Sequence, residues 1–181
     1  METTQRISSE VHDLPMIIRG PEQPNQSAIA QLFAELLADG NQNVLPPYVV
    51  SQRDPSLLIQ TLYTSMKSNN DLHRFGFTRG QAVVYGFLSS RGDTLQAPQL
   101  SLAVHPSFRH RGFAQSMASQ LHDLARIRGA TSIRVTIPRE NNHAIALCRS
   151  FGYQILVTTK THLHGSLRLA NARDVPSRSV A

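Results

Sequence analysis

The stretch Pro98–Ala114, PQLSLAVHPSFRHRGFA, constrains the fold of this chain of 181 residues more than any other. Apolar residues alternate with polar or small ones in its first half, at Leu100, Leu102 and Val104. This period of two predicts a strand, which Pro106 ends because proline cannot donate to a ladder. From Phe113 onward apolar residues recur every three or four positions, which predicts a helix over residues 113–128. The stretch therefore predicts a strand, a tight loop and a helix that opens at Gly112.

The expected start of that helix is suited to an anion. The first N–H groups of a helix have no internal partner, and the helix dipole adds partial positive charge there. Gly112 lets a ligand approach the backbone without a Cβ in the way, and Arg109, His110 and Arg111 surround it with basic side chains. A pyrophosphate would fit such a loop. The same residues also fit an ordinary strand-to-helix turn with solvated arginines, because short glycine motifs are weak signals alone.

Two blocks of the sequence resemble the motifs of the GNAT N-acetyltransferase family. Residues Arg109–Ala114 reproduce its acyl-CoA-binding motif, Arg/Gln-x-x-Gly-x-Gly/Ala, and Leu102–Phe108 resemble the strand and turn before it. Residues Asn141–Tyr153 are similar to Asn-x-x-Ala-x-x-Leu-Tyr-x-x-x-Gly-Phe/Tyr, with Cys148 where the family usually has tyrosine. The blocks stand in the family's order and at its usual separation. The likeness extends over roughly residues 15–165.

The resemblance implies an α/β fold, namely a single GNAT-like domain with a central mixed, mostly antiparallel sheet and helices on both faces. The order of the predicted elements also favours an α/β class built around one mixed sheet. We expect the domain over residues 15–168, after a flexible arm over residues 1–14 and before a disordered tail over residues 169–181.

Periodicity and turn residues predict the other elements. Helices are expected over 26–38, from Asp54-Pro55 to Asn69-Asn70, and from Asn141 or Asn142 to Phe151. Strands are expected over 16–19, 72–79, 82–89, 132–137 and, as the last strand, 153–161. The connection Gly40–Arg53 is expected to hold no regular helix because it contains Pro46-Pro47.

The resemblance also implies acetyl-CoA as co-substrate and a site without a metal. Backbone groups of Leu102, Ala103 and Val104 would pair with the pantetheine arm. The pyrophosphate would be held by the loop residues Arg109, His110, Arg111, Gly112, Phe113 and Ala114. Asn141 would contact the cofactor arm from the other side. Leu45 and Tyr48 would line the acceptor site, because the family shapes that site with the connection between its first two helices.

The general base is not evident from the sequence. The central strand offers Gln99 and Ser101 and no carboxylate, although the family often places a glutamate there. Glu140 and His143 stand near the second motif, where each is more readily explained as a solvated residue at a helix start. We therefore expect a water relay to remove the proton.

Cys148 is open to two interpretations. As the counterpart of the family's tyrosine it could protonate the leaving thiolate, since an ordinary thiol has a pKa near ~8.5. The interpretation we favour is a small buried filler, a part that cysteine commonly plays. An acyl-enzyme on Cys148 is disfavoured because the nearest histidine, His143, does not share its helical face.

Charge and composition limit the partners and the cellular location that we expect for the protein. The net charge of +6 favours anionic ligands, yet the arginines are scattered and no basic run or aromatic RNA platform is present, so we expect no nucleic-acid partner. No apolar run approaches the ~20 residues that span a bilayer, so no membrane association is expected. The polar N-terminus and the single cysteine favour a cytoplasmic protein. His162 and His164 lack a third ligand and are not expected to bind a metal.

The resemblance thus implies an N-acetyltransferase that moves an acetyl group from acetyl-CoA to a primary amine of a small molecule or peptide by direct attack. An acyl-CoA-binding sensor or interaction module with little turnover is the alternative, kept open by the missing tyrosine and glutamate. A basic nucleic-acid-binding protein is a third reading, supported by net charge alone. The acceptor-side segments carry few acidic residues, chiefly Glu35, Asp39 and Asp54, which disfavours a polycationic acceptor. Whether the chain forms a homodimer stays open.

Overall fold

The structure is a computed structural model that describes residues 15–21, 26–51, 55–90 and 96–169 of the chain. The expected arm over 1–14, the tail beyond residue 169, the helix cap at Asp54 and the turn at 91–93 lie outside these residues. Within the described ranges, no helix combines the length and the apolar character that crossing a membrane requires.

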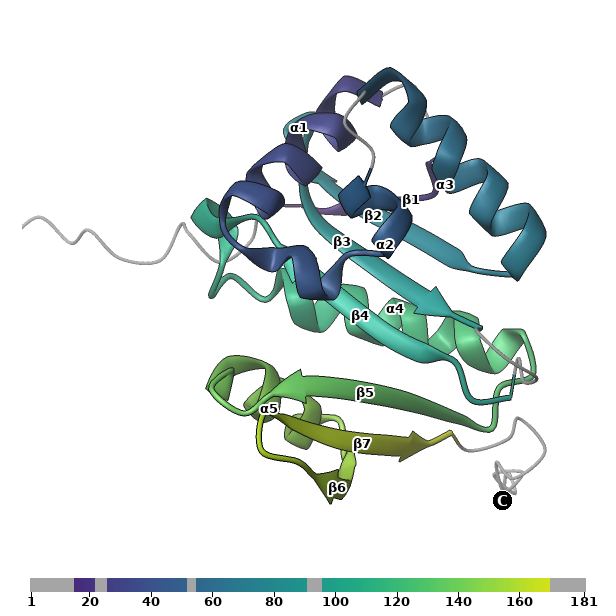
Figure 1. Cartoon of the computed structure of the whole chain (residues 1–181), viewed down its shortest axis with the longest axis vertical. Helices are drawn as coiled ribbons and strands as arrows, with labels where there is room; N and C mark the ends of the chain where they lie inside the picture. Colours follow the sequence, from purple (N-terminus) through teal and green to yellow (C-terminus); the bar gives the residue numbers. More distant parts are fainter. Residues whose placement is uncertain (1–14, 22–25, 52–54, 91–95, 170–181) are drawn as a thin grey trace, which may run out of the picture.

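A seven-stranded sheet organises the described part of the chain, in the order β1-β2-β3-β4-β5-β7-β6 (Figure 1). Its strands are β1 (Ile17–Arg19), β2 (Leu72–Thr78), β3 (Gln81–Ser89), β4 (Gln99–Val104), β5 (Ser132–Pro138), β6 (Gln154–Thr158) and β7 (His162–Arg168). Strands β4 and β5 run parallel, and the other neighbouring strands run antiparallel. The predicted mixed, mostly antiparallel sheet is therefore confirmed.

Helices cover both faces of this sheet, as predicted. The helices are α1 (Gln26–Ala38), α2 (Pro47–Ser51), α3 (Pro55–Asn69), α4 (Phe113–Ile127) and α5 (Asn142–Ser150). One apolar core forms where α1, α2 and α3 cover the sheet and includes Phe33 and Tyr85. The other forms beneath α4 and α5 and includes Met117 and Ile133. Figure 1 shows α4 crossing behind β4, on the side away from α2.

The region after α5 differs from the prediction. The prediction of a single last strand over 153–161 was wrong. The chain forms β6, turns, and returns as β7, which lies between β5 and β6. The turn is closed by Thr159, whose amide donates to the His162 carbonyl at 2.8 Å. In β7 polar residues and Gly165 interrupt the apolar alternation, so the sequence gives only a weak strand signal there.

The connection after α1 also differs. Instead of holding no regular helix, it contains the 3-10 helix η1 (Asn41–Val44) and the α-helix α2 (Pro47–Ser51). The amides of Val49 and Val50 donate to the Pro46 carbonyl at 2.9 and 3.1 Å. Residues in the first turn of a helix need no N–H partner, so the two prolines begin this helix and do not break it.

Gly86 in β3 lets α4 approach the sheet closely. A Cβ at this position would lie 2.6 Å from Leu121 Cδ1 and 2.7 Å from Met117 Cγ, two fully buried side chains of α4. We expect Gly86→Ala to lower the free energy of unfolding by about 1–3 kcal/mol through overpacking, as measured by denaturant titration. Ser119→Ala, on the exposed side of α4, is the control and should stay within about 0.5 kcal/mol. If Gly86→Ala lowered the free energy of unfolding as little as Ser119→Ala does, this close packing would be contradicted.

Candidate functional site

The two parallel strands at the centre of the sheet are joined at one end only. Their register contains the single pair Gln99–Arg134, whereas β4 pairs with β3 along its whole length. Hydrogen bonds close this end: the Gln96 carbonyl accepts from Thr131 and Ser132 at 2.8 and 3.0 Å, and the Arg134 amide donates to the Pro98 carbonyl at 2.9 Å. Beyond it the strands diverge (Figure 1). Backbone groups of β4 that face β5 are therefore left without a partner strand.

The open end of this divergence faces the starts of two helices. Because β4 and β5 are parallel, their carboxyl ends lie at the same edge, and they lead to α4 and α5 respectively. Gly112 is the N-cap of α4 and Asn141 is the N-cap of α5, and both line one cleft. Two helix N-termini thus place their partial positive charge at one opening.

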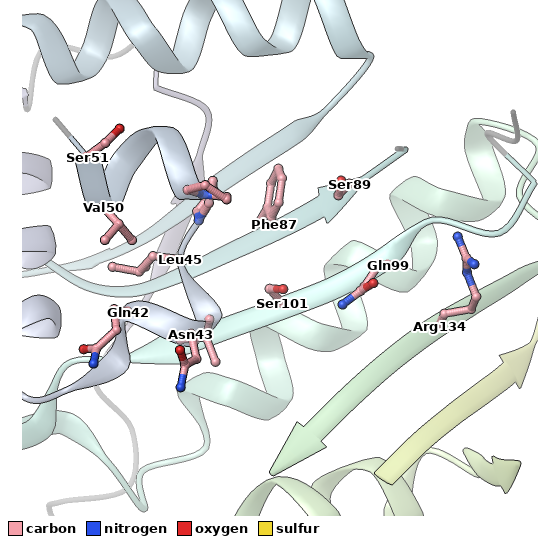
Figure 2. A pocket seen from close by; sticks show the side chains of 13 residues that line it. Gln42, Asn43, Leu45, Val50, Ser51, Phe87, Ser89, Gln99, Ser101 and Arg134 are labelled. Carbon is pink, nitrogen blue, oxygen red and sulfur yellow. The ribbon is translucent and has the colours of Figure 1, made fainter. Parts of the chain in front are cut away.

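Three cavities follow the divergence and share lining residues. The anion cleft, of about 700 Å³, is lined by Asp39, Asn41, Val44, Leu102, Ala103, Val104, Phe108, Arg109, His110, Gly112, Phe113, Ala114, Gln115, Asn141, His143, Ala144 and Leu147. The splay cavity, of about 190 Å³, lies between the strands and reaches Cys148 and Tyr153. The outer cavity, of about 600 Å³, lies between η1, α2 and the sheet (Figure 2). Val44 lines all three, so η1 covers their junction.

The loop before α4 has the backbone conformation that an anion site needs. Gly112 has φ 78° and gives α4 no side-chain cap, so the first amides of the helix have no side-chain acceptor. His110 also has a positive φ, of 62°. All the residues predicted to bind the cofactor line the anion cleft except Arg111. The Arg111 guanidinium instead lies 5.2 Å from the centre of the Phe108 ring, a cation–π contact on the surface.

Glu35 of α1 and Asp39, the residue directly after that helix, contact this loop. Arg109 forms an ion pair with Asp39, and hydrogen bonds from Arg109 and Asn41 lower the pKa of the Asp39 carboxyl. His105 Nδ1 accepts from the Ser107 amide at 3.1 Å, so the ring proton belongs on Nε2, which faces the Glu35 carboxylate. Sequence reasoning missed both contacts because the partners lie about 70 positions apart, where no local pattern links them.

The predicted acceptor residues occupy different positions. Leu45 lines the outer cavity, as Figure 2 shows, but Tyr48 is not among the described residues that line it. The Tyr48 hydroxyl lies 3.1 Å from His73 Nε2 and 2.7 Å from Ser65 Oγ, which lies 2.7 Å from Asp71 Oδ2. Tyr48 thus fixes α2, one wall of the cavity, to β2 and α3.

Buried histidines support the site without carrying charge. Burial lowers the pKa of His73 to about 3, and its Nδ1 lies 2.8 Å from the Tyr85 hydroxyl. Burial likewise lowers the pKa of His122 to about 4, and its Nε2 lies 2.9 Å from the Tyr153 hydroxyl. Both rings are neutral at pH 7. His73 stacks behind Phe87 of the outer cavity, and His122 lines the splay cavity.

Cys148 lies in the apolar core beneath α5 and borders the splay cavity. Burial raises the pKa of its thiol to about 11. Such a thiol is a weaker acid than an ordinary thiol such as that of coenzyme A, so it would protonate a leaving thiolate uphill. The environment therefore supports the filler interpretation of Cys148.

The remaining candidates lie around the openings. His143 and His110 face one another at the anion cleft with ring centres 4.5 Å apart, and Glu140 is exposed before α5. His164 Nδ1 lies 3.1 Å from Thr136 Oγ1, and His162 borders the splay cavity. In the described part of the chain, no group of three or more histidine, cysteine or acidic residues is placed to hold a metal ion.

A sheet that diverges at its centre, with a glycine-containing loop leading from the divergence into a helix, is a fold that this chain shares with solved acetyltransferases. Residues 46–153 match the model of the Acetyltransferase (GNAT) family, and the chain belongs to this family. The resemblance inferred from the two sequence blocks is confirmed.

Individual relatives are distant. The chain is similar to Acetyltransferase YE1169 of Yersinia enterocolitica, with 26% identity over 88 residues, which is 49% of this chain and 62% of that protein. The match thus spans less than two thirds of this curated relative. The structure of yncA from Salmonella typhimurium with its cofactor acetyl-CoA superposes with TM-score 0.69 and 17% identity, over 86% of this chain and 94% of that chain. PaiA N-acetyltransferase from Thermoplasma acidophilum, in complex with coenzyme A, gives TM-score 0.66 and 13% identity, over 86% and 99%.

The neutral His73 ring predicts a specific loss of stability in acid. Its folded pKa of about 3 lies below the ordinary 6.5, so the unfolded chain takes up the proton first as the pH falls. Stability is full above pH 6.5 and should drop by up to about 1.4 kcal/mol per pH unit below it. His122 acts in the same direction. Denaturant titrations between pH 7 and 5 should show a shallower slope for His73→Gln than for the wild type; equal slopes would contradict a buried neutral His73.

Cys148→Ala should cost about 1–2 kcal/mol of stability, by loss of buried volume, and leave turnover within a small factor. Melting temperatures and steady-state rates report the two effects separately. Cys148→Tyr should overpack α5 against the sheet and lower the melting temperature further. A fall in turnover of ~10²-fold or more in Cys148→Ala, with cofactor binding intact, would instead restore the thiol as a proton donor.

Proposed function

We propose that the chain transfers an acetyl group from acetyl-CoA to a primary amine of a small molecule or peptide. The observation that supports this most is that the anion cleft, the splay cavity and the outer cavity share lining residues along the divergence of β4 and β5. A ligand held by its phosphates in the anion cleft and an amine in the outer cavity would meet between these strands. Such alignment is the main requirement of a transfer from an already activated thioester.

The residues of the anion cleft fit acetyl-CoA. The uncapped amides from Gly112 onward suit a pyrophosphate, and Arg109 adds charge beside them. The backbone of Leu102, Ala103 and Val104 borders the cleft on the side without a partner strand, where the amides of a pantetheine arm could pair with it. Asn141 caps α5 through Oδ1, which accepts from the Ala144 amide at 3.0 Å, so its amide nitrogen is left for the ligand. Two proteins of similar fold were solved with acetyl-CoA and coenzyme A.

The chain itself would supply alignment and polarity. Strand β4 presents Gln99 and Ser101 to the outer cavity and carries no carboxylate. We therefore propose that a water held by these polar groups takes the proton of the attacking amine. Unpaired backbone amides of β4 would stabilise the charge that develops on the thioester oxygen. The amine nitrogen bonds to the thioester carbonyl carbon and the C–S bond breaks, so coenzyme A leaves as a thiolate that takes up a proton from water. No covalent enzyme intermediate is required.

An acyl-CoA-binding sensor with little turnover is the second candidate. It is favoured by Cys148 in place of the family's tyrosine and by the lack of a carboxylate on β4. A coenzyme-thiol release assay over amines, amino acids and peptide N-termini separates the two candidates. Release with at least one acceptor supports the transferase; stabilisation by acetyl-CoA without release from any acceptor supports the sensor.

Acetyl-CoA at about 100 times its dissociation constant should raise the free energy of unfolding by ~2.7 kcal/mol. Gly112→Asp should abolish this gain, because it puts a negative side chain at the anion cleft, and it should still fold because a Cβ there meets no atom within 4 Å. Gly112→Ala is the matched control, since it shares the strain of φ 78° without the charge. Melting temperatures with and without acetyl-CoA provide the measurement, and equal shifts for the wild type and Gly112→Asp would mean that the pyrophosphate binds elsewhere.

A further inference from the structure

We propose that the outer cavity selects acceptors that carry a carboxylate, and that Arg134 binds that carboxylate. The substrate class would be short peptides with a free carboxyl group and apolar side chains. This inference rests on the proposed acetyl transfer and specifies its acceptor.

The charge of the outer cavity carries the inference. Arg134 is the only charged residue among the described residues that line it, and no described carboxylate lies within ion-pair distance of its guanidinium. The other polar lining groups are neutral amides and hydroxyls, such as Gln99 and Ser101. A polycationic acceptor would meet repulsion there and no counter-charge. A carboxylate would meet the planar fork that binds it in two parallel hydrogen bonds.

The position of Arg134 suits this task. It lies on β5 opposite Gln99, at the closed end of the divergence. Its Nε donates to the Ala97 carbonyl at 2.9 Å, which orients the guanidinium and leaves the terminal nitrogens for a ligand. Figure 2 shows Arg134 at one end of the outer cavity, with Gln99 and then Ser101 following along β4 toward Asn43.

The length and walls of the cavity define the rest of the acceptor. The proposed reaction centre borders Leu102, three residues along β4 from Gln99, a distance of roughly 10 Å at the rise of a strand. The Arg134 side chain does not shorten this distance, because its Nε is held at the Ala97 carbonyl, on the far side of Gln99 from Leu102. The amine and the carboxylate of one acceptor must therefore lie roughly 10 Å apart, as the two ends of an extended tripeptide do. Phe87, Leu45 and Val50 offer an apolar wall to the side chains between these ends.

The test compares the tripeptide Ala-Ala-Leu with its C-terminal amide, by kcat/KM in the thiol release assay. The amine of the amide is the weaker base. For each variant the kcat/KM of the acid is therefore divided by that of the amide, and this ratio is compared with the wild-type ratio. Arg134→Gln should lower kcat/KM for the acid by about 10- to 100-fold, mainly through KM, because a charged hydrogen-bonded pair is lost. It should leave the amide within a factor of about three. Arg134→Lys should restore part of the loss, since it keeps the charge without the fork.

Arg168→Gln is the control, because Arg168 is an exposed arginine of β7 outside the outer cavity and should leave every ratio unchanged. Two results would overturn the inference and leave the proposed acetyl transfer standing. In one, Arg134→Gln lowers kcat/KM equally for the acid and the amide; in the other, the wild type acetylates only amines without a carboxylate. Absence of thiol release with every amine tested would instead overturn the proposed function and this inference with it.

Discussion

The site depends on one incomplete strand pairing. Strands β4 and β5 are held together at Gln99 and Arg134 and then separate, although each remains paired with its other neighbour. Unpaired backbone groups are unfavourable when they are buried away from water. The unpaired groups of β4 instead border cavities that admit polar ligands or water. The same divergence brings the N-termini of α4 and α5 to one opening. Anion binding, acyl alignment and acceptor access would all follow from this separation.

Carboxylates of α1 and of the residue after it reinforce the open edge. Glu35 and Asp39 reach His105 and Arg109 and so hold the loop before α4 against the helix. Asp39 also lines the anion cleft, where its lowered pKa keeps it charged. Arg109 is thereby positioned between a protein carboxylate and the place proposed for the pyrophosphate. The loop is thereby held against the end of α1, while Arg109 and Gly112 line the cleft.

Buried polar groups shape the other two cavities. Neutral His73 links Tyr85 to Tyr48 and supports the wall that α2 builds, whereas neutral His122 pairs with Tyr153 under the splay cavity. Cys148 lies near the latter pair in the same apolar surroundings, and the low polarity that keeps the histidines uncharged also keeps the thiol protonated. The departure from the family's tyrosine thus lies where burial raises the pKa of the side chain, which favours a packing role.

Local sequence determined the strand, loop and helix from Gln99 to Ile127, because alternation, Pro106 and Gly112 act within a few residues of one another. It also indicated the cofactor residues along that stretch, through spacing that the family shares. It missed β7, whose interrupted alternation becomes a strand only because β5 and β6 pair with it on either side. Tertiary structure alone decided that Arg111 stacks on Phe108, that Tyr48 faces His73, and that Arg134 reaches the outer cavity. The contacts of Tyr48 and Arg134 depend on segments distant in the sequence, which no local pattern encodes, whereas the contact of Arg111 with Phe108 depends on the positive-φ turn at His110.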